Sequence, residues 1–155
     1  MTKGNPIRNS AKSLIVRDQH LLLIKKQDDQ GIYYIFPGGG QEKGETLEEA
    51  VHRECLEEID AKVNVYELAY VREYIGKNHE FSEVDGDVHQ LEFYFHCEIL
   101  ETSINGQPTQ PDVDQIGVEW LPIDRLTEYR IYPKAMVETV RNESSNQRIY
   151  LGDVN

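Results

Sequence analysis

Three glutamates, Glu54, Glu57 and Glu58, lie close together on a predicted helix, where their carboxylates could bind a divalent cation. Thr46 and Glu49 have the spacing of a capping box, and the apolar residues that follow recur at helical intervals. At about 100° per residue, the acids fall on the stripe that is apolar in the first turns, not on the solvent side. Like charges at helical spacing repel, and Mg²⁺ or Mn²⁺ prefers hard oxygen ligands. The pattern favours a metal site over an ordinary solvated acidic face.

A glycine-rich turn precedes this helix. Pro37 is followed by Gly38, Gly39 and Gly40, directly after a predicted strand that ends at Phe36. Glycines let the backbone turn sharply, so carbonyl groups of the turn can be left open to a ligand. We therefore treat the turn and the acidic helix as one candidate site.

The spacing of these residues resembles the Nudix box, G-x5-E-x7-R-E-U-x-E-E-x-G-U, in which U is a bulky aliphatic residue. The fixed positions are matched by Gly39, Glu45, Arg53, Glu54, Glu57 and Glu58. Cys55 and Ala61 are smaller than the usual aliphatic residue, and Asp60 replaces a glycine that would end the helix in a left-handed conformation. The departure at Asp60 bears on the end of the helix and not on the chemistry.

The resemblance implies a divalent-metal-dependent pyrophosphohydrolase. Such enzymes cleave a nucleoside diphosphate linked to another moiety by attack of water on phosphorus, and Mg²⁺ or Mn²⁺ neutralises the phosphate oxygens. The implied metal ligands are three carboxylates and one backbone carbonyl, those of Glu54, Glu57, Glu58 and Gly38. Glu45 would lie beside them. Arg53 is four residues before Glu57 and is close enough to orient its carboxylate.

The general base is open at this point. Some members of the family use a glutamate of the box, for which Glu54 and Glu57 are the candidates here. Others use a carboxylate from the loop before the last strand, which offers Asp112 and Asp114 in this chain. We take Asp114 as the loop candidate, with a solvated surface acid as the alternative.

Residues outside the box must bind the rest of the substrate. Tyr33 and Tyr34 are candidates for stacking on a base, with a position in the core as the alternative. Residues 88–100 alternate between apolar and polar side chains, which predicts a long strand with one wetter face. Glu92 and Tyr94 lie on that face, where Glu92 is a candidate substrate contact and solvent exposure is the simpler interpretation. Nucleoside triphosphates, nucleotide sugars such as ADP-ribose, and dinucleoside polyphosphates all stay open as substrates.

The remaining chain predicts the elements that position this site. The apolar run from Leu21 to Ile24 predicts a strand that is covered on both faces. Residues 75–87 predict an exposed hairpin tip, and residues 132–141 a final helix. The predicted strands are 7–16, 20–26, 32–36, 88–100 and 117–122, and residues 62–74 predict one or two more. This order predicts a mixed sheet between helices, in agreement with the α/β/α sandwich that the resemblance implies.

Length and composition set limits on the function. A chain of 155 residues with 39% hydrophobic content predicts a single domain, with residues 1–6 and 142–155 as tails. The apolar residues 149–151 could dock on the domain or on a second copy, so a homodimer stays open. The charge of −12 argues against non-specific nucleic-acid binding. No apolar run could span a membrane and no signal peptide is visible, so we expect a cytoplasmic protein with a small nucleotide partner.

Two other classes of protein are compatible with this resemblance. An isoprenoid-diphosphate isomerase would need a catalytic cysteine, whereas Cys55 and Cys97 both lie on faces that predict buried free thiols. A non-catalytic nucleotide sensor would be expected to have a degenerate box. Because every acid of the box is present, the sequence favours hydrolysis.

Overall fold

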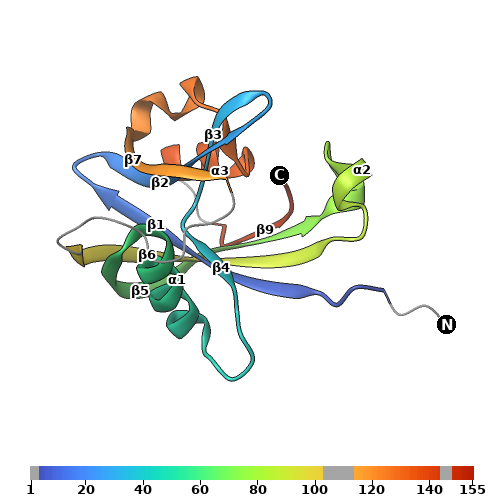
Figure 1. Cartoon of the computed structure of the whole chain (residues 1–155), viewed down its shortest axis with the longest axis horizontal. Helices are drawn as coiled ribbons and strands as arrows, with labels where there is room; N and C mark the ends of the chain where they lie inside the picture. Colours follow the sequence, from blue (N-terminus) through green and yellow to red (C-terminus); the bar gives the residue numbers. More distant parts are fainter. Residues whose placement is uncertain (1–3, 103–113, 144–147) are drawn as a thin grey trace.

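Strand β1 (Arg8–Arg17) organises the sheet because it pairs with different partners along its length. Its first part runs parallel to β6 (His89–Thr102) and pairs antiparallel with the short strand β4 (Gly38–Gly40). Its last two residues open a hairpin with β2 (His20–Asp28). The computed structural model describes residues 4–102, 114–143 and 148–155, which Figure 1 traces in sequence colours.

Two half-sheets meet at this strand. One contains β4, β1, β6, β5 (Ala61–Ile75) and β9 (Tyr150–Asp153), with β5 antiparallel to β6 and β9 parallel to β5. The other contains β2, β3 (Gly31–Ile35), β7 (Gln115–Pro122) and β8 (Ile131–Tyr132), with β8 parallel to β3. The sheet is therefore mixed, as the order of elements predicts.

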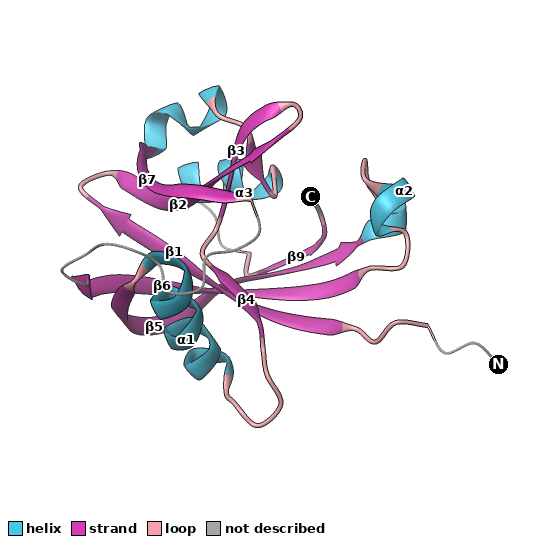
Figure 2. Cartoon of the chain, in the orientation of Figure 1, coloured by secondary structure: helices cyan, strands magenta, loops and turns pink. Residues whose placement is uncertain are grey.

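Helices cover both faces of the sheet (Figure 2). Helix α1 (Leu47–Ile59) packs over a buried cluster that includes Leu22 and Ile24. The 3-10 helix η2 (Ile123–Glu128) and helix α3 (Ala135–Arg141) contribute to a second cluster that includes Leu21 and Leu23. Successive residues of β2 thus alternate between the two cores, which confirms the strand covered on both faces. The architecture is the α/β/α sandwich that the sequence predicts.

Several element boundaries differ from the predicted ones. The final helix begins at Ala135 and not at Tyr132, because Tyr132 belongs to β8 and pairs with β3. Strands β4 and β9 were not predicted. Strand β9 places the apolar segment 149–151 beside β5, where the Val71 N–H donates to the Ile149 carbonyl at 2.9 Å.

The connection between β5 and β6 is the predicted hairpin tip, and it contains two short helical turns. These are η1 (Gly76–Asn78) and α2 (Ser82–Asp85), at the end of the sheet opposite the β5–α1 junction (Figure 1). Most of the loop before the last predicted strand, including the base candidate Asp112, lies outside the described residues. Phe81 projects from the hairpin tip toward the second half-sheet, where its ring meets Tyr132 of β8.

The predicted wet face of β6 is wrong at its centre. Tyr94 has no exposed surface and Glu92 is only 4% exposed. Tyr94 belongs to the core beneath α3, where its ring packs against Phe36 at a centroid distance of 5.4 Å. Alternation alone could not show that α3 and the end of β3 cover this face.

Two further expectations can be compared with the structure. Cys55 and Cys97 are free and buried, as the sequence predicts. Within the described part of the chain, no helix is both long and apolar enough to cross a membrane.

Candidate active site

Helix α1 begins and ends as the sequence predicts. The Thr46 hydroxyl accepts from the Glu49 N–H at 3.1 Å, and the Glu49 carboxylate accepts from the Thr46 N–H, which completes the capping box. At the other end, Asp60 takes the left-handed conformation with φ 52°, and its N–H donates to the Cys55 carbonyl. The aspartate thus ends the helix as a glycine would, at some steric cost.

Glu54, Glu57 and Glu58 lie on the side of α1 that faces the glycine turn, whereas Glu48 and Glu49 in its first turn are exposed. The side chains of Glu54 and Glu57 are 14% and 26% exposed, and Glu58 is 4% exposed. Strand β4 lies against α1 and pairs with β1, so the turn is fixed from two sides. This arrangement brings the glutamates of the box to one place.

Arg53 holds several of these carboxylates together. Its Nη1 donates to Glu54 at 2.9 Å and to Glu57 at 3.3 Å, while Nε and Nη2 bind both carboxylate oxygens of Glu45 at 3.1 and 2.7 Å. Nη2 also donates to the Gly40 carbonyl at 3.0 Å. Its hydrogen bonds with Glu45 raise the pKa of Arg53 and lower the pKa of Glu45. Arg53 is therefore a permanent positive charge that offsets the repulsion among the acids.

Glu58 is bound directly to the turn. Its carboxylate accepts from the Gly38 N–H at 2.8 Å. Gly38 has φ 137°, and a Cβ atom there would overlap the backbone of Ala11 and Lys12 on β1. Only glycine fits this position, and the close approach of β4 to β1 depends on it.

Gly39 provides the space that the Glu54 carboxylate occupies. A Cβ atom at Gly39 would lie 2.6 Å from a carboxylate oxygen of Glu54. The carboxyl group thus rests on the bare backbone of the turn. The glycine of the box and its first metal-ligand candidate are in direct contact.

These residues fit a divalent cation by the chemistry of their donors. Glu54, Glu57 and Glu58 offer carboxylate oxygens on one side of α1, and the turn offers backbone carbonyls. Among the described residues, however, no group of three such side chains already stands in the geometry of an ion site. Arg53 Nη1 bonds to one carboxylate oxygen of Glu54 and one of Glu57, so an ion would be bound through the other oxygen of each while Arg53 keeps its contacts.

A sequence model of the NUDIX domain matches residues 7–141, which is most of the chain. The chain belongs to the Nudix family. It is 31% identical over 127 residues to putative nudix hydrolase 1 of Caenorhabditis elegans, covering 78% of this chain and 30% of the relative. It is 47% identical over 57 residues to the NAD-capped RNA hydrolase NudC of Photorhabdus laumondii, covering 37% of this chain and 21% of the relative.

A solved structure shares the fold of this Nudix chain. The NUDIX hydrolase from Nitrosomonas europaea superposes with a TM-score of 0.74 at 18% identity, and the match covers 94% of each chain. The two relatives named above are longer than this chain, which spans less than a third of the length of each. The comparisons therefore establish the family and the fold of this Nudix protein.

Asp114 lies at the start of β7, close to the end of α1. Its carbonyl accepts from the Gln27 N–H at 3.3 Å, and its neighbour Gln115 donates from the side chain to the Glu58 carbonyl at 2.8 Å. Asp114 is exposed and has φ 64°. The structure thus brings the loop candidate next to the carboxyl end of the box helix, and its role as a base stays a prediction.

The substrate-binding candidates lie in three different environments. Tyr34 is 5% exposed and its hydroxyl donates to Glu119 at 3.0 Å, which fits the core alternative. Tyr33 is partly exposed and lines a separate pocket. Glu92 forms a buried ion pair with Arg72 at 2.7 Å and lines a small cavity of about 110 Å³.

Two cationic residues beside the site were missed by the sequence argument. Lys12 Nζ donates to the carbonyls of Phe36 and Gly38 at 3.5 and 3.4 Å, and both Lys12 and Arg72 line the small cavity. The other cations of β1, Arg8 and Arg17, stand at its two ends, and the other cation of β5, Lys62, stands near its start. A cation in the interior of a predicted strand is the signal by which Lys12 and Arg72 could have been found.

The contact between Gly39 and Glu54 predicts that Gly39→Ala destabilises the turn. The added methyl group must displace the Glu54 carboxylate, which is the end of a flexible side chain, so we expect the lower end of the overpacking cost, about 1 kcal/mol. Urea unfolding measures the change. Gly117→Ala is the matched control, because a Cβ atom there would meet only the Lys25 Cβ at 4.0 Å. Equal stability of the two variants would contradict the predicted contact.

Proposed function

We propose that this Nudix protein hydrolyses the diphosphate linkage of a nucleoside diphosphate derivative in a reaction that depends on Mg²⁺ or Mn²⁺. The observation that carries the proposal is the cluster of Glu54, Glu57 and Glu58, which face the glycine turn and are largely screened from solvent. Oxygen donors in such a place suit a hard divalent cation. The name of the relative from Photorhabdus laumondii, an NAD-capped RNA hydrolase, supports a nucleotide substrate.

In the proposed reaction, the three box glutamates and the Gly38 carbonyl hold the cation. When bound, Mg²⁺ or Mn²⁺ supplies positive charge against the phosphate oxygens. Arg53 orients the carboxylates of Glu54 and Glu57, and Glu45 fixes the position of Arg53. Asp114 is proposed as the base that takes a proton from the attacking water, with Glu54 and Glu57 as the box alternatives.

The isomerase alternative is disfavoured by the state of the cysteines. Burial raises the pKa of Cys55 to about 12 and also raises the pKa of Cys97. Both thiols are therefore neutral at physiological pH, whereas a nucleophilic or acid–base cysteine must be reachable and able to ionise. The sensor alternative is decided by whether any nucleotide is hydrolysed.

A substrate panel tests the proposal. Nucleoside triphosphates, nucleotide sugars including ADP-ribose, and dinucleoside polyphosphates are incubated with the protein and Mg²⁺ or Mn²⁺, and the phosphate-containing products are separated by chromatography. We expect hydrolysis of at least one class and complete loss of that hydrolysis in excess chelator. Full turnover in chelator would overturn the metal dependence, and a panel without hydrolysis would favour the sensor.

A further inference from the structure

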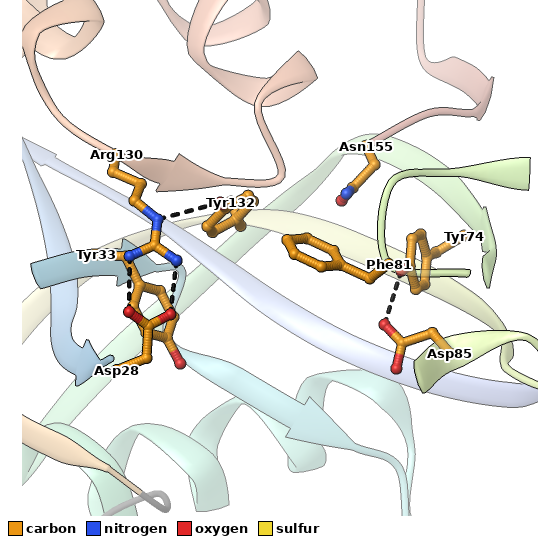
Figure 3. A pocket seen from close by; sticks show the side chains of 8 residues that line it. All are labelled: Asp28, Tyr33, Tyr74, Phe81, Asp85, Arg130, Tyr132 and Asn155. Atoms are coloured by element: carbon orange, nitrogen blue, oxygen red, sulfur yellow. Dashed lines mark hydrogen bonds and ion pairs between the residues drawn. The ribbon is translucent and has the colours of Figure 1, made fainter. Parts of the chain in front are cut away.

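A pocket of about 310 Å³ lies between the two half-sheets, away from the box helix (Figure 3). One wall belongs to the second half-sheet and the segment before β8, and the other to the end of β5, the hairpin tip and the segment after β9. The residues that line it are Asp28, Tyr33, Arg130 and Tyr132 on one side and Tyr74, Phe81, Asp85 and Asn155 on the other. A volume of this order is typical of small-molecule sites.

Aromatic rings from three separate segments form the interior of this pocket. The Tyr132 ring meets Tyr33 edge-on at 5.9 Å and Phe81 edge-on at 5.5 Å between centroids. Figure 3 shows Phe81 reaching from the hairpin tip across to Tyr132. Phe81 is 37% exposed, so part of its apolar ring is in contact with water. Ring surfaces of this kind suit stacking on a planar heteroaromatic group.

A fixed ion pair borders the rings. Arg130 binds both carboxylate oxygens of Asp28 at 2.9 and 2.6 Å, and its Nε donates to the Tyr132 hydroxyl at 3.1 Å. The Arg130 guanidinium also lies 5.0 Å from the centroid of the Tyr33 ring. The guanidinium covers part of the Tyr33 and Tyr132 rings. Because Asp28 neutralises Arg130 and Asp85 adds a further carboxylate, this pocket offers aromatic rings and hydrogen-bonding groups and no net positive charge for a phosphate. Its chemistry fits the base of a nucleotide better than the phosphates.

A second, smaller cavity shares Tyr132 with this pocket and lies beside the glycine turn. Tyr132 also lines the small cavity of about 110 Å³, together with Lys12, Arg72 and Glu92. Two cations face one carboxylate there, an excess of positive charge in a protein with a net charge of −12. Lys12 Nζ lies 3.4 Å from the Gly38 carbonyl, so the cavity reaches the turn of the Nudix box.

We propose that the aromatic pocket binds the nucleobase of the substrate, while the phosphates extend past Tyr132 and Lys12 toward Gly38. The inference rests on the proposed function and deepens it. It makes Phe81 and Tyr33 residues that determine specificity, because they contact the base and lie away from the bond that is cleaved. It also assigns the β5–β6 hairpin tip, through Phe81, to substrate recognition.

Calorimetric binding of reaction products tests the inference without metal or turnover. AMP, GMP, CMP, UMP and ribose 5-phosphate are titrated into the full chain in chelator. We expect at least one nucleoside monophosphate to bind about tenfold more tightly than ribose 5-phosphate, and Phe81→Ala to remove about tenfold of that affinity while leaving ribose 5-phosphate unchanged. Val84→Ser is the matched control, since Val84 lies on α2 and is 87% exposed.

The outcomes separate the inference from the proposed function. Suppose that the substrate panel shows hydrolysis but Phe81→Ala binds every nucleotide within about twofold of the wild type. This result would overturn the proposed base site and leave the proposed hydrolase activity standing. Binding no tighter for any nucleoside monophosphate than for ribose 5-phosphate would also overturn it. If the base site is correct, Phe81→Ala raises KM for the hydrolysed substrate about tenfold while kcat stays near the wild-type value, because the lost contact is made in the ground state and the transition state alike.

Discussion

Glu57→Gln and Glu58→Gln are each expected to raise the Mg²⁺ concentration for half-maximal hydrolysis by about tenfold or more and to lower kcat. Each change removes one negative oxygen from the proposed ligands, and even the loss of a group that only orients a ligand costs about 10–100-fold in metal affinity. Asp114→Asn is expected to behave differently. The loss of a base lowers kcat by about 10²–10⁴-fold and leaves the Mg²⁺ dependence nearly unchanged, since a base contributes little to cation binding.

Titration of Mg²⁺ against the initial rate distinguishes the three variants, and calorimetric Mn²⁺ binding reports on the site without turnover. Glu48→Gln is the matched control, because Glu48 is an exposed acid in the first turn of the same helix. A Glu57→Gln variant with wild-type Mn²⁺ affinity would show that Glu57 is not a ligand. If Asp114→Asn has near wild-type turnover, the base belongs to the box, with Glu54 and Glu57 as the first candidates.

The local structure of the box could be predicted from the sequence because its determinants are close together in the chain. The Thr46 cap needs only the residue three positions on, and the left-handed Asp60 replaces the glycine of the family pattern at the same position. The periodicity of α1 also predicted that Glu54, Glu57 and Glu58 would face away from solvent. Each of these features depends on interactions within one or two helical turns.

The environment of those acids could not be predicted in the same way. From the sequence we expect Glu54, Glu57 and Glu58 to repel one another. The helical spacing predicts a contact of Arg53 with Glu57 only. In the structure Arg53 also binds Glu45 and Glu54, and Glu58 turns to the Gly38 N–H instead. These contacts depend on how the glycine turn folds back along α1, and the periodicity of a single helix carries no information about that packing.

The aromatic pocket could not be predicted from local sequence patterns at all. Tyr33, Phe81 and Tyr132 are far apart in the sequence and meet only because the hairpin tip of one half-sheet faces the second half-sheet. Residues 132–141 show the same limit, since their helical pattern predicts a helix from Tyr132. Pairing with β3 converts Tyr132 into a strand residue instead, and so places its ring in the pocket. Tertiary pairing here overrides local propensity.

Loss of the buried ion pair between Arg72 and Glu92 is expected to have the largest effect on stability. The residues are 5% and 4% exposed, and Arg72 Nε donates to Glu92 at 2.7 Å. Arg72→Met leaves the Glu92 carboxylate buried without its main partner, which typically costs about 3–5 kcal/mol of unfolding free energy. We expect the lower end of that range, because Lys12 also acts on the charge of Glu92. Arg125→Met is the control, since the exposed pair of Arg125 with Glu128 should contribute less than about 1 kcal/mol.

This effect should depend on pH in a definite direction. Burial raises the pKa of Glu92, but the charges of Arg72 and Lys12 outweigh burial and lower the pKa from 4.5 to about 2. The stability that the ionised carboxylate provides is therefore complete above pH 4.5 and is lost as the pH falls toward 2. Urea unfolding should show the largest difference between the wild type and Arg72→Met at pH 7, and a clearly smaller difference at pH 3. A difference that is below 1 kcal/mol at pH 7, or that grows on acidification, would mean that the pair does not stabilise the fold through its charges.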